Sequence, residues 1–164
     1  MALIFSASEI FQMGIEIEKN GKAFYAACGR ATGNEAVKKL CEELSAWEDE
    51  HVAVFEKLKA QLPASASLEV INDPDDELQL YLKAAADSHV FVAGTDVASI
   101  IAAATTPEKI LATALFFEKD SVVVYSTMLR MVPDHFGKKN LEKIIDEELK
   151  HISIITRKMA MFKK

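Results

Sequence analysis

A short pattern occurs twice in this chain, the second copy one hundred residues after the first. Each copy has a glutamate, a tyrosine seven residues later, and further on a Glu-x-x-His pair. The members are Glu18, Tyr25, Glu48 and His51, and then Glu118, Tyr125, Glu148 and His151. Residues three, four and seven apart share one face of a helix. Four carboxylates and two imidazoles at this spacing are the ligand set of a two-metal site inside a helical bundle.

Apolar residues recur at helical spacing in four long segments. The second of them stops at Pro63, and the third opens with Thr106-Pro107, a cap followed by proline at the first helical position. Low counts of glycine and proline (6 and 4) fit an all-α protein. We expect the helices at about Ser8–Gly29, Glu35–Leu62, Thr106 to just before Pro133, and Lys138 to about Phe162.

A long connection, from Pro63 to Thr105, separates the second helix from the third. We expect short helices in it at about Asp76–Ser88 and Thr95–Ala104. The other two links are short, so each joins an antiparallel hairpin. The sequence therefore predicts an all-α four-helix bundle made of two helical hairpins with one long crossover. The length of 164 residues fits one domain, spanning 1–164.

All six repeated glutamates and histidines fall in line with apolar residues, so they should face the core. A buried carboxylate loses several kcal/mol of hydration unless it is paired or neutralised. Lysine and arginine are absent from the neighbouring core-facing positions, apart from Lys22. Two divalent cations would balance four carboxylates, with the histidines bound as neutral imidazoles. Such ligands suit iron, manganese or zinc.

The alternative interpretation of a single Glu-x-x-His pair is a solvated surface pair, which is the common case. Here there are two such pairs in register, each on an apolar stripe and each with an upstream Glu-x6-Tyr. The other histidines, His89 and His135, have Ala86 and Val132 three residues before them. The repeat therefore favours the metal site strongly.

Four segments, IEIEKNGKAFY, EDEH, LFFEKDSVVVY and DEELKH, resemble the rubrerythrin-like branch of the ferritin-like di-iron carboxylate superfamily. The resemblance covers essentially the whole chain. It implies two iron ions held by the six repeated glutamates and histidines, with Glu48 and Glu148 bridging them. It also implies a di-iron oxidoreductase that reduces peroxide or dioxygen.

The chain departs from full rubrerythrins in two ways. Those proteins carry a rubredoxin-like domain whose iron is held by four cysteines, whereas this chain has two, Cys28 and Cys41. Electrons would therefore come from a separate donor, such as a rubredoxin-type protein. Rubrerythrins also usually have an extra carboxylate near the glutamate of the third long helix, where this chain has Leu115 and Ser121. The site is thus a symmetric, six-ligand version.

Three further sets of residues have more than one interpretation. Tyr25 and Tyr125 could donate hydrogen bonds to ligand carboxylates across the bundle or could be core tyrosines with incidental partners. The two cysteines flank one hairpin turn, and buried inert thiols are favoured over a redox role. Trp47, beside Glu48, is expected to pack in the core.

Two other classes of function stay open. The first is iron handling, in which Fe(II) is oxidised for storage or delivery. The second is a metal-stabilised binding or scaffold protein without turnover, in which Phe91, Val92 and Val97 of the crossover would form a partner or dimer surface. We expect a homodimer, whereas an iron-storage cage would need a larger assembly.

The net charge of −6 and the pI of about 5.3 argue against binding to nucleic acid or to anionic lipid. The most apolar stretch, Val97–Ala104, is too short to span a membrane. The first residues, MALIFSASEIF, lack the basic and apolar regions of a signal peptide. With two cysteines and no CxxC motif, these features predict a cytoplasmic protein.

Overall fold

The computed structural model describes residues 6–63, 77, 80, 82–84, 97–132 and 134–162. Within these residues the regular structure is helical and no strand occurs. The long helices are α1 (Ala7–Ala31), α2 (Glu35–Ala60), α5 (Pro107–Met131) and α6 (Lys138–Ala160). A short helix, α4 (Val97–Ala103), precedes α5, and a 3-10 turn, η2 (Asp134–Phe136), precedes α6. In this part of the chain, no helix combines the length and apolar character needed to cross a membrane.

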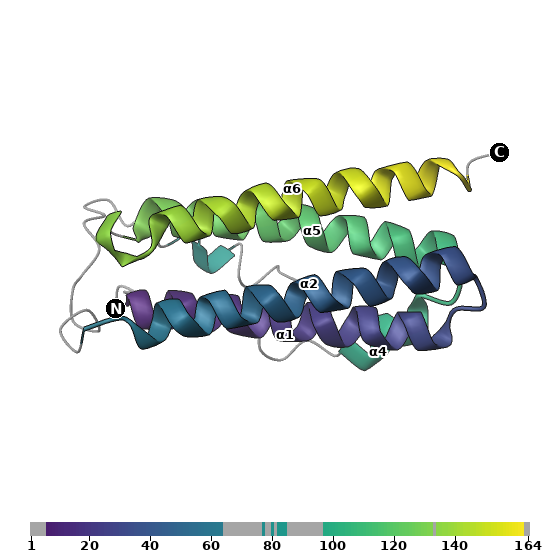
Figure 1. Cartoon of the computed structure of the whole chain (residues 1–164), viewed down its shortest axis with the longest axis horizontal. Coiled ribbons are helices and arrows are strands. Elements are labelled where there is room, and N and C mark those ends of the chain that lie inside the picture. The colour runs from purple at the N-terminus through teal and green to yellow at the C-terminus, as the bar shows by residue number, and fades with distance from the viewer. Residues whose placement is uncertain are drawn as a thin grey trace.

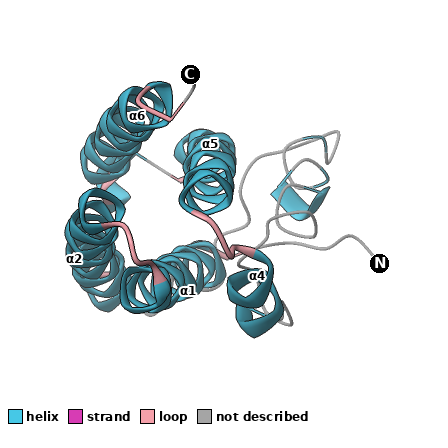
Figure 2. Ribbon diagram, turned by 90° about the vertical axis from the view of Figure 1, so that its right-hand side faces the viewer, coloured by secondary structure: helices cyan, strands magenta, loops and turns pink. Residues whose placement is uncertain are grey.

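The four long helices form two hairpins that lie against each other (Figure 1). Helix α1 packs along α2, and α5 packs along α6. The hairpins meet through α1 with α5 and through α2 with α6. The end-on view in Figure 2 shows the four helices around a common centre, with α4 outside the bundle beside α1. The predicted all-α four-helix bundle is confirmed.

Local sequence signals set the starts of the helices. The hydroxyl of Ser6 accepts a hydrogen bond from the backbone of Glu9, whose side chain accepts one from the backbone N–H of Ser6. Asn34 and Thr106 cap α2 and α5 in the same way, through side-chain oxygens. Such caps stabilise a helix by about 1 kcal/mol each. The observed bounds of the long helices lie within two residues of the predicted ones.

Helix α6 instead begins after a glycine. Gly137 has φ of 90°, in the left-handed region that glycine adopts without steric cost. A Cβ atom built there would lie 2.1 Å from Cδ2 of Leu58 on α2. Both the backbone turn and the close approach of the two hairpins therefore require glycine at this position.

The crossover is described only in part. Helix α4 confirms the helix expected at Thr95–Ala104. Of the helix expected at Asp76–Ser88, the described residues are 77, 80 and 82–84, and they are helical. The rest of that segment, with Phe91 and Val92 of the suggested partner surface, lies outside the described residues. Leu82 is fully buried in the core.

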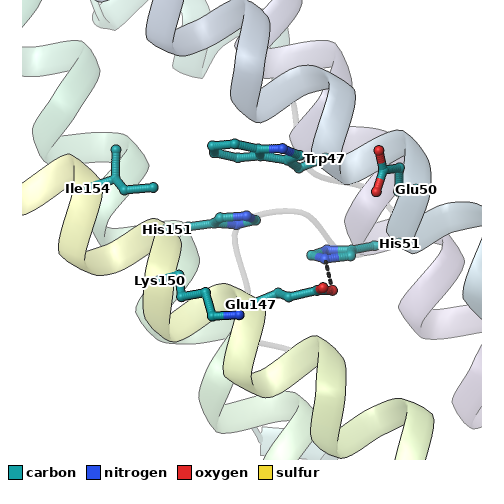
Figure 3. A pocket seen from close by; sticks show the side chains of 7 residues that line it. All are labelled: Trp47, Glu50, His51, Glu147, Lys150, His151 and Ile154. Atoms are coloured by element: carbon teal, nitrogen blue, oxygen red, sulfur yellow. Dashed lines mark hydrogen bonds and ion pairs between the residues drawn. The ribbon is translucent and has the colours of Figure 1, made fainter.

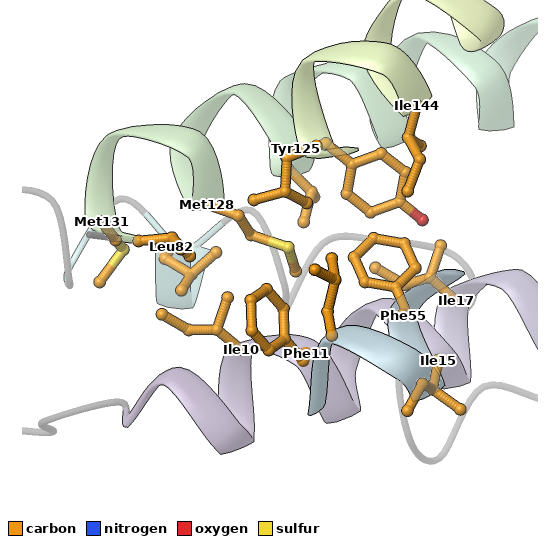
Figure 4. Close-up of a cluster of buried hydrophobic side chains, with 14 residues drawn as sticks. Ile10, Phe11, Ile15, Ile17, Phe55, Leu82, Tyr125, Met128, Met131 and Ile144 are labelled. Atoms are coloured by element: carbon orange, nitrogen blue, oxygen red, sulfur yellow. The ribbon is translucent and has the colours of Figure 1, made fainter. Parts of the chain in front are cut away.

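The core consists of two apolar clusters, one toward each end of the bundle. The first contains Phe11, Phe55, Tyr125 and Met128 among others, contributed by α1, α2 and α5 (Figure 4). The second is built around Phe24, Tyr25, Leu44, Phe117 and Ile155. The glutamates and histidines of the repeat belong to neither cluster and lie on the same helices between them. The packing therefore places a polar site in the middle of an apolar interior.

Candidate metal centre

The six repeated glutamates and histidines converge from all four long helices. Glu18 comes from α1, Glu48 and His51 from α2, Glu118 from α5, and Glu148 and His151 from α6. We call these six residues the glutamate–histidine cluster. None of them is more than 5 % exposed, so the prediction that they face the core is confirmed.

The cluster divides into two adjoining groups of four. Within each group, one ligand atom from every residue lies within 4.8 Å of the others. The first group is Glu18, Glu48, His51 and Glu148, and the second is Glu48, Glu118, Glu148 and His151. Glu48 and Glu148 belong to both groups, as bridging carboxylates must. Such an arrangement could hold two adjacent metal ions with a shared pair of ligands.

The histidine nitrogens face the carboxylates closely. Nδ1 of His51 lies 3.1 Å from Oε1 of Glu148 and 3.5 Å from Oε2 of Glu48. This nitrogen is buried and forms no hydrogen bond with the described residues. On the other side, Nδ1 of His151 lies 3.0 Å from Oε2 of Glu148 and 3.4 Å from Oε2 of Glu118. A buried nitrogen without a partner, aimed at several carboxylates, fits a site built to receive a cation.

The positive charge that the cluster needs does not come from lysine or arginine. Among the described residues, no side chain of either type is buried. Lys22, the nearest candidate in the sequence, has its ammonium 2.5 Å from Oδ1 of Asp49 and is 44 % exposed. The carboxylates must therefore be compensated by protons or by metal ions.

In the absence of metal, the glutamates differ in how they hold protons. Burial, reinforced by the neighbouring carboxylates, raises the pKa of Glu48 and Glu118 well above the usual range. Burial alone would raise the pKa of Glu148 too. Its close polar contacts with Glu118, His151 and His51 outweigh that effect and lower the pKa instead. The metal-free cluster thus keeps one bridging carboxylate ionised and favours a proton on two others.

Both histidines hold their protons more tightly than free imidazole. Burial alone would lower the pKa of His151, but its hydrogen bonds with Glu118 and Glu148 raise it to about 9. Burial alone would lower the pKa of His51 too, but the carboxylates of Glu148, Glu18 and Glu48 close to its Nδ1 raise it instead. Within the cluster, two glutamates and two histidines have raised pKa values. One proton on each of these four groups adds the same total charge as two divalent ions. Metal binding can therefore replace protons with little change in the net charge of the core.

The two tyrosines connect the hairpins. The hydroxyl of Tyr25, on α1, donates a hydrogen bond of 2.5 Å to Oε1 of Glu118 on α5. Tyr125, on α5, donates one to Oε1 of Glu18 on α1. Burial and the nearby carboxylates raise the pKa of each phenol well above 10, so both stay protonated. Of the two interpretations that the sequence left open, the structure has the hydrogen bonds across the bundle, while a part in catalysis stays a prediction.

Two cavities border the cluster. The larger, of about 220 Å³, opens between α2 and α6 over the outer edges of both histidines (Figure 3). Trp47, Glu50, Glu147, Lys150 and Ile154 complete its lining. The smaller, of about 10 Å³, lies between α1 and α5. It has room for about one water-sized molecule. Glu18, Glu48, Glu118 and Tyr25 line it with Gly21 and Ser121.

The sequence did not predict two contacts of the histidines. The indole of Trp47 packs on the second apolar cluster, as expected, but it also stacks on the ring of His151. Oε2 of Glu147 lies 3.3 Å from Nε2 of His51. The sequence feature that could have indicated these contacts is that Trp47 and Glu147 directly precede the shared glutamates, Glu48 and Glu148.

The cysteines agree with the prediction of buried thiols. Cys28 and Cys41 are free and buried near the turn of the first hairpin. Burial raises the pKa of Cys28 to about 11 and that of Cys41 to about 12. A thiol that stays protonated at neutral pH is a poor nucleophile.

Comparison with known proteins identifies the fold. No protein-family model matches the chain, and no curated protein matches it. Among solved structures, it is similar to a Thermotoga maritima protein described as a ferritin-like diiron-carboxylate protein. The TM-score is 0.74, the sequence identity is 21 %, and the match covers 96 % of each chain. A likeness at this identity shows the fold, and the chain therefore has a ferritin-like fold.

The sharing of ligands predicts different effects of single substitutions. Glu48→Gln or Glu148→Gln removes a ligand from both groups and should abolish binding of the metal pair. Glu18→Gln removes a ligand from one group only, and about one ion should remain. Elemental analysis of the folded variants measures this. Equal losses in all three variants would contradict the assignment of bridging residues.

The raised pKa values predict how metal and pH act together on stability. Imidazole titrates near 6.5 in the unfolded chain and near 9 at His151 in the metal-free fold. The stabilisation from the protonated ring is therefore complete below pH 6.5 and lost as the pH rises through 9. The raised pKa values of Glu48 and Glu118 act in the same direction, beginning above their ordinary value of 4.5. The metal-bound form uses neutral imidazole and ionised carboxylates, so it should not lose this stability.

The difference in Tm between metal-bound and metal-free protein should consequently widen as the pH is raised from 6 to 9. An increase on the order of 5–10 °C is expected from the shift at His151. Thermal melts with and without chelator at several pH values test this, since other titrating groups are common to both forms. A difference that stays constant or narrows with rising pH would show that the cluster does not exchange protons for metal.

Proposed function

We propose that the protein is a di-iron carboxylate oxidoreductase that reduces peroxide, or dioxygen, with electrons from a separate donor protein. The observation that carries the proposal is the convergence of the glutamate–histidine cluster into two groups that share Glu48 and Glu148. The ferritin-like fold and the resemblance of four sequence segments to rubrerythrins support it. Manganese or zinc would fit the same ligands.

The residues of the cluster would hold the metal pair and leave it reactive. When bound, a ferrous pair supplies two electrons, one from each ion, to break the O–O bond of hydrogen peroxide, and uptake of two protons yields two waters. The glutamates and histidines position the ions, and the flanking apolar clusters exclude bulk water. Tyr25 and Tyr125 fix the orientation of the outer glutamates through their hydrogen bonds.

The cavities favour a small oxidant. The space of about 10 Å³ adjoins three of the glutamates and is bounded by the small residues Gly21 and Ser121. Its size suits a molecule such as dioxygen or hydrogen peroxide and is far below the 300 Å³ or more of ordinary ligand pockets. The larger cavity lies over the histidines and gives solvent a path to that side of the cluster.

The electron donor is the part of the proposal that rests on sequence alone. The chain has two cysteines, too few for the four-cysteine iron of a rubredoxin-like domain. The described cysteines are free, buried and protonated, so they offer no redox pair at the surface. We therefore propose that a separate, rubredoxin-type donor protein re-reduces the site.

This dependence on a donor predicts a single turnover. Iron-loaded, reduced protein mixed with peroxide and NADH should be oxidised once, consuming about one peroxide per metal pair, and then stop. Addition of a rubredoxin-type donor and its reductase should restore cycling. Stopped-flow absorbance of the ferric product, with a peroxide assay, measures both stages.

The choice of oxidant separates the proposal from its alternatives. Faster oxidation by peroxide than by dioxygen is expected of the oxidoreductase. Preference for dioxygen with uptake of many irons per chain would favour iron handling instead. A loaded protein that reacts with neither oxidant would contradict both and favour a metal-stabilised scaffold. The Glu48→Gln variant is the control, because it lacks a bridging ligand.

A further inference from the structure

The two copies of the repeat differ at several positions near the histidines, and one of these differences reaches the histidine rings themselves. Positions 47 and 147 are equivalent in the two hairpins, each one residue before a bridging glutamate. One is tryptophan and the other is glutamate. Each side chain contacts the histidine of the other hairpin, at the outer face of the cluster. Figure 3 shows Trp47 and Glu147 on opposite sides of the histidine pair.

His51 has a carboxylate partner. Oε2 of Glu147 lies 3.3 Å from Nε2 of His51, while Nδ1 of the same ring faces the glutamates of the cluster. If Nδ1 held a metal ion, Nε2 would carry the ring proton and would donate a hydrogen bond to Oε2 of Glu147. The other carboxylate oxygen, Oε1, lies 3.4 Å from Nζ of Lys143, one helical turn away, which helps to orient the group. A carboxylate on the far nitrogen fixes the imidazole ring and makes it a stronger metal ligand.

His151 has an aromatic partner instead. The ring of Trp47 lies parallel to it, with centroids 4.9 Å apart and an interplanar angle of 9°. Stacking holds the imidazole in place but supplies no acceptor for an N–H group. No carboxylate among the described residues forms a hydrogen bond with Nε2 of His151 that would match the one on His51.

We propose that this exchange of tryptophan for glutamate makes the two metal positions unequal, with the position at Glu18 and His51 binding the first and tighter ion. Glu147 is the positioning residue for that ion. The position at Glu118 and His151 binds the second ion more weakly. The inference rests on the two-metal site of the proposed function, and it adds which position fills first and why.

Anaerobic titration of the metal-free protein with Co(II) tests the inequality, because ligand-field absorbance reports binding without redox chemistry. Two steps are expected, with the first tighter. Glu147→Gln keeps the volume of the side chain but removes its charge. It should weaken the tighter step by about 10- to 100-fold, the usual effect of losing a carboxylate behind a metal-bound histidine. Trp47→Glu supplies a carboxylate at the equivalent position and should tighten the weaker step.

Variants that keep only one of the two histidines show which metal position the Glu147→Gln substitution weakens. In a His151→Gln background, Glu147→Gln should weaken the remaining ion, and in a His51→Gln background it should not. Glu50→Gln is the matched control, since Glu50 lines the same cavity and its loss removes the same charge. It should leave the ratio of the two affinities unchanged. Trp47→Phe keeps a stacking ring and should do the same, and circular dichroism checks that each variant is folded.

The outcomes distinguish this inference from the proposed function. Two ions bound with equal affinity, or an equal effect of Glu147→Gln in both histidine backgrounds, would overturn the inequality and leave the two-metal site in place. Failure of the folded wild-type protein to bind a pair of ions would overturn the site itself. A pair of unequal ions, shifted as described by Glu147→Gln and Trp47→Glu, would establish the inference whether or not the loaded protein reacts with peroxide.

Discussion

The rest of this structure depends on four carboxylates that are buried, away from water, at the centre of the helical bundle. Burial raises the pKa of Glu48 and Glu118, and the neighbouring carboxylates raise the pKa of both histidines. No buried lysine or arginine within the described residues relieves the charge. The core is stable only with protons or cations in it, and two divalent ions supply the charge of four protons. Folding of the chain therefore creates a buried cluster whose charge protons or metal ions must balance.

The fold holds this charge by placing it between two apolar clusters. The clusters supply most of the driving force for packing, and the two tyrosines connect the hairpins across the site. Tyr25 and Tyr125 each belong to one apolar cluster and donate to a glutamate of the opposite hairpin. A slip of one hairpin along the other would break both hydrogen bonds and leave buried oxygens without donors. The polar site thus fixes the register that the apolar packing alone would leave less strictly defined.

Much of this was predictable from the sequence because helical periodicity and the repeat are local signals. They gave the bounds of the four long helices to within two residues, and they placed all six cluster residues on core-facing stripes. A helical stripe does not say which residue of another helix it will meet. For that reason the stacking of Trp47 on His151 and the contact of Glu147 with His51 were not predicted. Both depend on the axial register between hairpins. The bridging role of Glu48 and Glu148 came from the family resemblance and stays a prediction, although both residues belong to both groups.

The most direct test of this account is the position of metal in a crystal of the iron-loaded protein. Anomalous diffraction measured on either side of the iron absorption edge should show two peaks per chain inside the bundle. One should lie among Glu18, Glu48, His51 and Glu148, and the other among Glu48, Glu118, Glu148 and His151. A folded, iron-loaded chain with no peak between these residues, or with iron only at the surface, would contradict the claim that the buried carboxylates form a metal centre.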